Sequence, residues 1–361
     1  MPLINDPVHG FTPIRSQLLR DVVAHPLFQR LERIRQLGLS SFVYPGATHT
    51  RKAHSLGAYT LMQRAFRVLR EKGYFIFDSE EEAAEAAMLM HDLGHGPYSH
   101  VLESEIVQDY THEDISLMMM ERINDDLHGA LNLAIQIFKG EYGKPYLHEL
   151  ISSDELDMDR LDYLCRDAFY TGVREGALGA DRLIQMLELT EDEHLTMSIK
   201  AAYPMENYRV ARRLMYWQVY LHKTTVAAEE VLRRALRRAR QLAEGGADVP
   251  CTPALRYFLY PDAHRSLAPT GERCRSQKGA LQTPEAFLKN YAALDDSDIL
   301  CALKMWQEYP DEELARWARS FLERKLLKVH VDPETTDGYL FTKEVEKEGE
   351  RHLYAFYNQN S

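Results

Sequence analysis

The feature that most constrains this chain is a short segment, MLMHDLGHGPYSH, which runs from Met88 to His100. It follows the alanine-rich run EEEAAEAA, so its first residues continue an apolar segment with helical spacing. An imidazole and a carboxylate then stand side by side at His91 and Asp92. Burying such groups without partners is costly. The fold must therefore bring other polar groups, or a cation, to this point of the chain.

Candidate partners for this pair stand on both sides of it. His54 lies near the end of the segment PGATHTRKAHS, and Asp157, Asp159 and Asp162 stand in the segment LDMDRLDYLCRD. Adjacent helical residues point about 100° apart, so His91 and Asp92 share one ion only where a helix end faces it. Neutral imidazoles combined with carboxylates are typical ligands of Mn, Fe, Ni, Zn or Mg. A single buried histidine is more often a satisfied core residue, but the joint pattern predicts a site for one divalent ion.

Charge and composition narrow the class of protein. The 361 residues include enough apolar side chains for a large core, and the net charge of -12 argues against nucleic acid or an anionic membrane as the main partner. The basic run RRALRRAR at 233–240 is more typical of a solvated helix face. No apolar run is long enough for a membrane span, and the start, MPLINDPVHGF, lacks the features of a signal peptide. The four cysteines form no CxxC pair, so we expect a cytoplasmic protein.

Helical spacing dominates the first 245 residues. It predicts an unbroken amphipathic helix from Leu18 to Gln36, a helix over 55–72, and one or two long helices over 206–244. Ser79 is predicted to cap the alanine-rich helix, with Glu82 completing a capping box. After residue 325 the segments LLKVHV, GYLFTKEV and HLYAFY predict strands. We expect a helical domain over 1–245 and an α+β region over 246–361 that closes the pocket or makes subunit contacts.

Several segments together resemble one known family. DPVHG, HPLFQRLERIRQLG, VYPGATHTRKAHSLG, HDLGHGPYSH, THE and LDMDRLDYLCRD, between residues 5 and 170, are similar to segments of the HD superfamily of metal-dependent phosphohydrolases. They most resemble its branch of deoxynucleoside triphosphate triphosphohydrolases, and a weaker similarity, YRVARRLMYWQVYLHK, extends to Lys223. The resemblance implies a mainly α fold, an HD-domain helical bundle, with a smaller α+β C-terminal part.

The resemblance also implies the metal ligands and the groups that handle protons. The family's metal ligands fall on four residues of the matching types, His54, His91, Asp92 and Asp159. Asp157 and Asp162 are then supporting carboxylates, and the substrate's phosphates would bring a second Mg. The proton donor is His100, with Glu103 behind it at a spacing of i, i+3, where the family has Asp. His95 and His112 match positions that line the family's active site.

Substrate contacts are implied in the same way. The phosphates, ribose and base would contact Arg51 and Arg160. They would also contact one face of a long helix, formed by Arg212, Tyr216, Tyr220 and Lys223. Tyr216 stands where the family has His. Asp167 would bind the 3′-hydroxyl, while Tyr220 crowds the place of a 2′-hydroxyl. Tyr163 and Arg166 flank this region, and Arg166 could equally pair with Asp162 at i, i+4.

The predicted reaction is metal-dependent hydrolysis of a deoxynucleoside triphosphate to deoxynucleoside and tripolyphosphate. Three alternatives remain open: an HD phosphohydrolase acting on a nucleoside monophosphate, cyclic nucleotide or alarmone; a nucleotide sensor without turnover; and a structural metal site. The family commonly forms dimers or tetramers, so we expect a homo-oligomer. Regulated members carry an acidic and a basic residue where this chain has Ala24 and Glu32. We therefore expect no guanine-nucleotide activation at that position.

Overall fold

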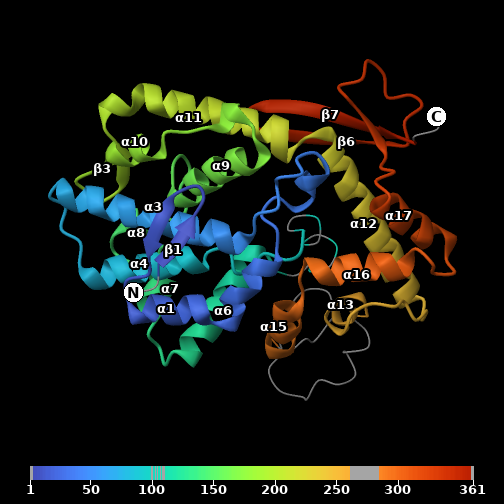
Figure 1. Cartoon of the computed structure of the whole chain (residues 1–361), viewed down its shortest axis with the longest axis horizontal. Helices are drawn as coiled ribbons and strands as arrows, with labels where there is room; N and C mark the ends of the chain where they lie inside the picture. Colours follow the sequence, from blue (N-terminus) through green and yellow to red (C-terminus); the bar gives the residue numbers. More distant parts are fainter. Residues whose placement is uncertain are drawn as a thin grey trace. The chain divides into compact units, whose positions relative to one another are not determined.

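The computed structural model describes residues 3–98, 101, 103, 105, 107, 110–260 and 284–358. Helices dominate this part of the chain, and its strands pair into three small antiparallel sheets (Figure 1). The mainly α class with β structure in the C-terminal part is confirmed. The chain divides into two compact units, Met1–Glu32 with Gly46–His95 and His112–Met215, and Arg33–Pro45 with Gly96–Thr111 and Tyr216–Ser361. The boundary predicted near residue 245 falls inside the second unit and stays a prediction.

The first unit is organised around helix α3 (Arg51–Glu71). Most of its side chains are buried, and it packs against α4 (Asp78–Met90) and α9 (Met158–Thr171). Thr50 caps its start, and Gly73, with a φ of 92°, follows its end. The other helices of this unit are α1 (Gln17–Ala24), α2 (Pro26–Gln29), α6 (His112–Asp126), α7 (Asn132–Phe138), α8 (Pro145–Glu149), α10 (Ala180–Gln185) and α11 (Ala202–Met215), with short 3-10 turns at Arg174–Gly176 and Ile199–Ala201.

Two hairpins complete the first unit. β1 (Leu3–Asp6) pairs with β2 (Gly10–Pro13), and β3 (Leu187–Leu189) pairs with β4 (Leu195–Met197). In the first hairpin, Asp6 lies opposite Gly10, and the Oδ1 atom of Asp6 accepts hydrogen bonds from the backbone N–H groups of Val8 and His9. Gly10 has a φ of 81°, which glycine adopts without strain. The carboxylate of Asp6 thus fixes the turn locally.

Two predictions about helix ends are wrong. The helix expected over Leu18–Gln36 is broken at His25, whose ψ of 137° is extended, because the following Pro26 disfavours a helical conformation before it. The chain continues as α2 and a 3-10 turn at Arg30–Arg33. The alanine-rich helix is not capped by Ser79. Its N-cap is Phe77, whose N–H donates to the carboxylate of Glu80 at 3.0 Å.

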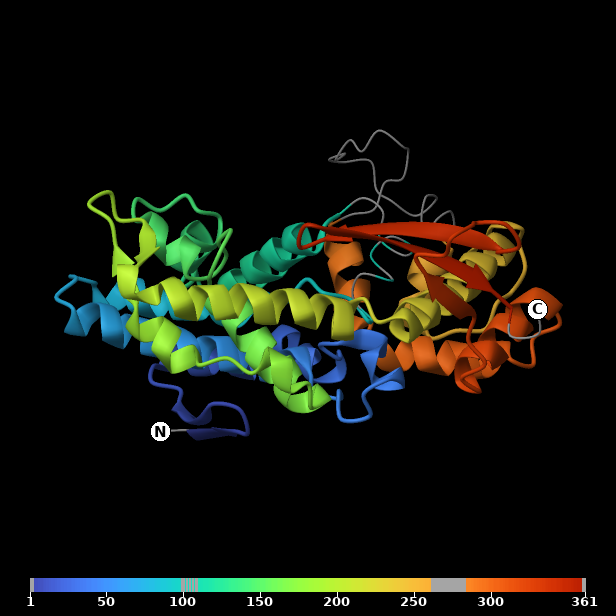
Figure 2. The same ribbon diagram turned by 90° about the horizontal axis from the view of Figure 1, so that it is seen from above.

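The second unit combines helices with a three-stranded sheet. A 3-10 turn at Gly38–Phe42 and a π-helical turn at Tyr216–Tyr220 precede α12 (Lys223–Glu244), α13 (Pro253–Leu259), α15 (Pro284–Ala293), α16 (Asp296–Trp306) and α17 (Glu312–Leu322). The sheet has the order β5 (Lys328–Val331), β7 (Glu350–Tyr357), β6 (Phe341–Lys347), and Figure 2 shows these strands in red. α12 packs against α17 and β5. These strands overlap the three segments predicted from the sequence, and β6 and β7 each extend two residues beyond them.

The long helical segment over 206–244 is two helices rather than one. α11 ends at Met215, the backbone then forms the π-helical turn, and α12 begins at Lys223. Within the described ranges, no helix combines the length and the apolar composition that crossing a membrane requires.

Candidate metal centre

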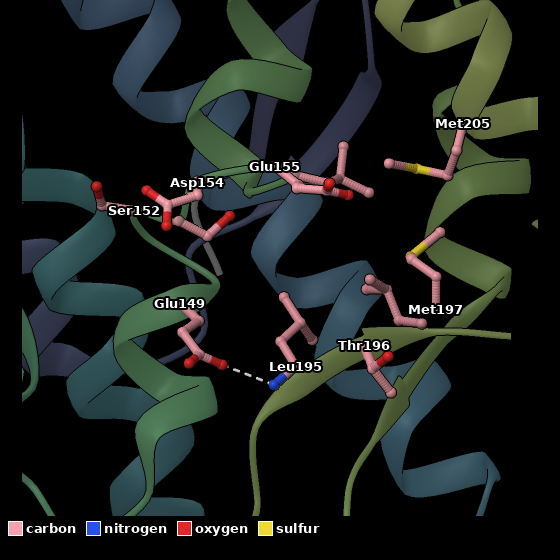
Figure 3. A pocket seen from close by; sticks show the side chains of 11 residues that line it. Glu149, Ser152, Asp154, Glu155, Leu195, Thr196, Met197 and Met205 are labelled. Atoms are coloured by element: carbon pink, nitrogen blue, oxygen red, sulfur yellow. Dashed lines mark hydrogen bonds between the residues drawn. The ribbon is translucent and has the colours of Figure 1, made fainter.

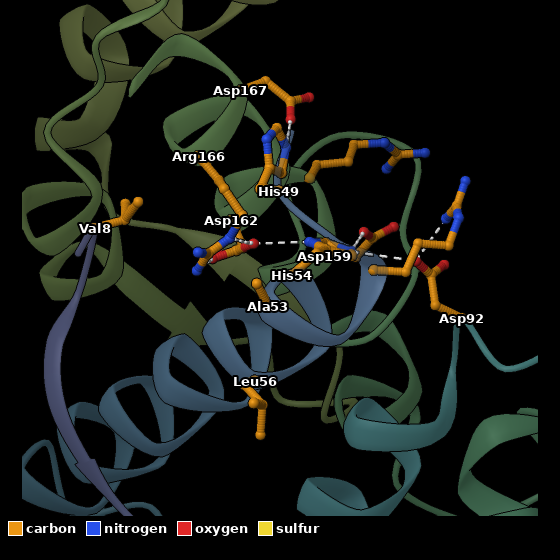
Figure 4. A network of polar contacts seen from close by, with 12 residues as sticks. Val8, His49, Ala53, His54, Leu56, Asp92, Asp159, Asp162, Arg166 and Asp167 are labelled. Carbon is orange, nitrogen blue, oxygen red and sulfur yellow. Dashed lines mark hydrogen bonds and ion pairs between the residues drawn. The ribbon is translucent and has the colours of Figure 1, made fainter. Parts of the chain in front are cut away.

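Two histidines of the first unit, His54 and His91, lie side by side with ring nitrogens within hydrogen-bond distance. His54 lies in the first turns of α3 and is fully buried, and His91 follows the last residue of α4. Their Nε2 atoms are 3.2 Å apart. The Oδ1 atom of Asp159, in the first turn of α9, lies 2.9 Å from Nε2 of His54 and 3.4 Å from Nε2 of His91. Figure 4 shows His54 and Asp159 meeting in this way.

The hydrogen bonds of the two Nδ1 atoms determine which ring nitrogens can bind a metal ion. Nδ1 of His91 donates to the carbonyl oxygen of Met88 at 2.7 Å, and Nδ1 of His54 donates to Oδ2 of Asp162, also at 2.7 Å. Since both Nδ1 atoms are used as donors, each ring in its neutral form keeps the lone pair of Nε2 for a cation placed between the two rings and Asp159. Such a partner on the far nitrogen is the usual arrangement behind a metal-bound histidine.

Asp92 brings a second carboxylate to the same place. Its Oδ1 atom lies 3.5 Å from Nε2 of His91, and its Oδ2 atom lies 3.8 Å from Nε2 of His54. Ligand atoms about 2.1 Å from one shared ion lie about 3 to 3.5 Å from each other, which is close to these separations. His54, His91 and Asp159 therefore form a group that could hold one divalent cation, and Asp92 lies beside this group. Imidazoles combined with carboxylates are a mixed donor set that leaves the metal identity open. The assignment of all four residues as ligands stays a prediction.

Without an ion, this cluster holds protons tightly. Burial by itself would lower the pKa of His54, but hydrogen bonds to Asp159 and Asp162 outweigh burial and raise the pKa to about 10. Burial would raise the pKa of Asp159, but hydrogen bonds from His54 and His91 hold it below the usual range. A divalent cation must replace a proton on His54 to bind there. Binding of an ion would therefore release a proton and strengthen as the pH rises.

Asp162 lies behind His54 and accepts a hydrogen bond from its Nδ1 atom. The supporting roles predicted for Asp162 and Asp157 stay predictions. Asp162 is completely buried and accepts hydrogen bonds from His54, from His9 and from two nitrogens of Arg166. The i, i+4 pairing of Arg166 with Asp162, which the sequence left open, is present. Figure 4 shows these two side chains next to His54.

Two of the three arginines predicted to hold phosphates, Arg51 and Arg160, each donate to a carboxylate of this unit. Arg51, at the start of α3, donates to Oδ2 of Asp92 at 2.6 Å and is buried. Arg160 donates to Asp157 at 2.8 Å and to the carbonyl oxygen of Ser153. Asp157 is the N-cap of α9, and burial together with the charge of Asp159 raises the pKa of its carboxyl to about 7. The phosphate roles of both arginines stay predictions.

The predicted proton-handling residues are only partly described. His100 lies outside the described residues, so the pairing of His100 with Glu103 is not tested. Glu103 is half-buried and belongs to the second unit. In the first unit, the rings of His95 and His112 stack with centroids 4.3 Å apart, and Nε2 of His95 lies 3.4 Å from Oδ1 of Asp92. His95 therefore lies beside Asp92, and His112 lies against His95; the catalytic roles of both histidines stay predictions.

The other predicted substrate contacts lie on four elements. Asp167 and Tyr163 are on α9, where the ring centroid of Tyr163 lies 6.4 Å from that of His54. Arg212 is on α11, but Tyr216 and Tyr220 belong to the π-helical turn and Lys223 begins α12. The expectation that these last four residues share one face of a single helix is therefore wrong, because the backbone changes its hydrogen-bonding period after Met215. Their roles in binding stay predictions.

Sequence reasoning missed two histidines of this unit. Nε2 of His49 donates to Oδ1 of Asp167 at 2.8 Å, and its ring stacks on Tyr170 with centroids 4.5 Å apart. Nε2 of His9 donates to Oδ1 of Asp162 at 2.6 Å. Both stand inside segments that carry the family resemblance, DPVHG and VYPGATHTRKAHSLG, and this position was the only signal for them.

A separate hollow of about 520 Å³ lies elsewhere in the first unit (Figure 3). Its wall includes Glu149, Asp154, Glu155, Met197 and Met205. The carboxylate of Glu149 already accepts from the backbone N–H of Leu195 and pairs with His194, both at 2.6 Å. None of the residues predicted to bind metal or substrate lines this hollow.

Comparison with known proteins gives matches over most of the chain. Residues 51–167 match the HD domain and residues 178–249 match the HD associated region. YwfO of Bacillus subtilis, named only as an uncharacterized protein, is 33% identical over 333 residues, which cover 90% of this chain and 71% of that protein. The crystal structure of a phosphohydrolase from Bacteroides thetaiotaomicron has a TM-score of 0.89 and 43% identity, covering 99% of this chain and 100% of that chain.

More distant matches carry a named activity. Human deoxynucleoside triphosphate triphosphohydrolase SAMHD1 is 28% identical over 286 residues, covering 68% of this chain and 45% of the human protein. The SAMHD1 homolog of Dictyostelium discoideum is 29% identical over 258 residues, covering 66% of this chain and 49% of that protein. The chain spans about half the length of these two relatives.

Proposed function

Because the chain belongs to the HD-domain family of phosphohydrolases, we propose that it hydrolyses deoxynucleoside triphosphates, in a metal-dependent reaction, to deoxynucleoside and tripolyphosphate. The observation that carries this proposal is the meeting of His54, His91, Asp92 and Asp159 in one cluster, in which His54 and Asp92 are buried and His91 and Asp159 are half-buried. The choice of substrate is supported by the relatives of named activity, the SAMHD1 triphosphohydrolases.

The residues of the chain divide the work of the proposed reaction. A divalent ion held by the four ligands would acidify a water molecule and polarise a phosphate oxygen. His91 keeps its ligand nitrogen directed at that place, because its other nitrogen is bound to the carbonyl oxygen of Met88. Arg51 holds Asp92 in position and adds positive charge beside the reacting phosphate. His100 protonates the leaving 5′-oxygen, with Glu103 orienting its ring.

Further residues would select the sugar. In the proposed complex Asp167 binds the 3′-hydroxyl, and the hydrogen bond from His49 directs its carboxylate. Tyr220 crowds the place of a 2′-hydroxyl, so ribonucleotides are rejected by a clash. Arg212 and Lys223 hold the phosphate tail. We also propose that the working protein is a homo-oligomer, a dimer or tetramer, and that it acts in the cytoplasm.

A second candidate is hydrolysis of another nucleotide phosphoester at the same site. Arg160 is held by Asp157 and Ser153, and Arg51 by Asp92, so two of the predicted phosphate contacts already have partners. A substrate with fewer phosphate charges, such as a nucleoside monophosphate or a cyclic nucleotide, would need fewer contacts from these arginines.

The test is chromatography of products after incubation of the purified protein with each dNTP and each NTP. The reactions contain Mn or Mg, with a chelator in parallel, and the Asp92→Ala variant is the matched control. Deoxynucleoside with tripolyphosphate, lost with the chelator and with the variant, is the expected result. Turnover of monophosphates or cyclic nucleotides alone would favour the second candidate, and stoichiometric binding of nucleotide without product would indicate a sensor.

A further inference from the structure

The metal ligand His54 is connected to the N-terminal hairpin by a continuous set of buried polar contacts. We propose that Asp6 and His9 of this hairpin are positioning residues of the proposed metal centre, and that together with Arg166 they hold Asp162 so that His54 directs Nε2 at the ion. The inference rests on the proposed metal site. It does not depend on which nucleotide is the substrate.

Asp162 is the centre of this arrangement. Its Oδ2 atom accepts from Nδ1 of His54 at 2.7 Å and from Nε of Arg166 at 2.9 Å. Its Oδ1 atom accepts from Nε2 of His9 at 2.6 Å and from Nη2 of Arg166 at 2.9 Å. Four donors thus fix both carboxylate oxygens, so the carboxylate cannot rotate away from His54 without breaking several hydrogen bonds at once. Asp162 and Arg166 are completely buried, so bulk solvent does not reach these contacts.

Asp6 connects the same network to the backbone of the hairpin. Its Oδ2 atom accepts from Nη1 of Arg166 at 2.8 Å, while its Oδ1 atom accepts from the N–H groups of Val8 and His9. One carboxylate therefore both shapes the turn that carries His9 and holds the far end of the guanidinium. The carbonyl oxygen of His9 is held in turn by Arg64 at 2.7 Å. The side chain of His9 is 4% exposed, so its ring has little room for another orientation.

The consequence for His54 is chemical as well as geometric. An ionised carboxylate on Nδ1 keeps the proton on that nitrogen, leaves the lone pair on Nε2, and makes Nε2 a stronger donor to a cation. Loss of His9 removes one of the four donors to Asp162. Loss of Asp6 removes the acceptor of Nη1 of Arg166 and of the N–H groups that shape the turn carrying His9, so Arg166 and His9 hold Asp162 less firmly. The ring of His54 then loses its fixed direction. Substitution of such outer partners typically weakens metal binding about 10- to 100-fold.

The test compares four hairpin variants of the full chain with the wild type, using Co²⁺ as the probe. His9→Ala removes the hydrogen bond from His9 to Asp162, and Asp6→Asn removes the ion pair between Asp6 and Arg166. His9→Gln restores an N–H donor near Asp162. Thr12→Val is the control, because Thr12 lies in the same hairpin and bonds the buried hydroxyl of Thr60 at 2.7 Å but touches none of this network. Affinity is measured by competition with a fluorescent chelator, and the ligand field by the visible absorption of bound Co²⁺.

The expected result is a loss of Co²⁺ affinity of about tenfold or more in His9→Ala and Asp6→Asn, with a changed absorption spectrum. His9→Gln should recover part of the loss, and Thr12→Val should keep the wild-type affinity and spectrum. Wild-type affinity in His9→Ala, beside a complete loss in His91→Ala, would overturn this inference and leave the metal site standing. An equal loss in Thr12→Val would show a general loosening of the hairpin and would overturn it too. A wild-type protein that binds no Co²⁺ would overturn both this inference and the proposed function.

Discussion

Gly57→Ala is the substitution for which this structure gives the sharpest prediction. Gly57 lies in α3 where that helix passes α9. A Cβ atom on this residue would lie 2.0 Å from Nη2 of Arg166 and 2.0 Å from Oδ1 of Asp162. Real carbon atoms do not approach so closely, so the ion pair must move by about 1 Å or the two helices must separate. Both side chains are completely buried, which leaves no space into which they can move.

Two effects of opposite sign decide the stability of this variant. Alanine is a better helix former than glycine, which by itself would stabilise α3 by about 1 kcal/mol. Breaking a buried ion pair costs about 3 to 5 kcal/mol, because an uncompensated charge stays inside the protein. The difference predicts a net loss of about 2 to 4 kcal/mol in the free energy of unfolding. Affinity for a divalent ion should fall as well, since Asp162 no longer holds His54.

Urea denaturation followed by tryptophan fluorescence and circular dichroism measures this loss. Gly143→Ala is the matched control, because a Cβ on the exposed Gly143 meets no atom within 4 Å. Its effect should stay within about 0.5 kcal/mol. A Gly57→Ala protein that is more stable than the wild type, with unchanged metal affinity, would refute the reasoning. Helix propensity would then outweigh the contact that we hold to be decisive.

Three further predictions concern the ligands, the proton donor and the response to pH. His91→Ala and Asp92→Ala should lose bound metal and turnover together, measured by elemental analysis and product chromatography; turnover without metal would contradict the ligand assignment. His100→Ala should keep its metal and lose about 10²- to 10⁴-fold in kcat, and full activity would remove His100 from the proton-donor role. Burial and the charge of Glu81 raise the pKa of Glu85 to about 8, so the folded chain keeps a proton that the unfolded chain releases near pH 4.5. The stability contributed by this group is therefore fully present at low pH and is lost as the pH rises from about 4.5 to 8. Glu85→Gln should raise the Tm more near pH 9 than near pH 5, and an equal rise at both would exclude this cause.

Local patterns in the sequence were enough to predict the class of fold, and they singled out the histidines and carboxylates of the candidate metal centre. The helical spacing of apolar residues in the first 245 residues shows which face of each helix is buried. The alternation of apolar and polar residues in the last three segments shows the same for each strand. These patterns predicted α3, α12 and the strands β5 to β7, because period and burial are properties of a short segment. The pair His91–Asp92 at the end of an apolar helix predicted in the same way that polar partners must come from elsewhere.

Local patterns failed where a single backbone detail outweighed them. The apolar stripe from Leu18 to Gln36 continues through His25, but Pro26 ends α1 there. The spacing of Arg212, Tyr216 and Tyr220 fits one helix face, but a π-helical turn intervenes. In both cases the hydrophobic period extends across the break, so the period alone does not locate it.

Only the tertiary structure decided which distant groups meet. His9 and Asp162 are separated by 153 residues and His49 and Asp167 by 118, yet each pair shares one buried hydrogen bond. No periodicity links residues so far apart, because their contact depends on how α3, α9 and the first hairpin pack together. The sequence by itself determined that histidines and carboxylates would be buried in this protein. Packing determined which carboxylate holds which histidine, since a buried polar group must find its partner on a neighbouring element.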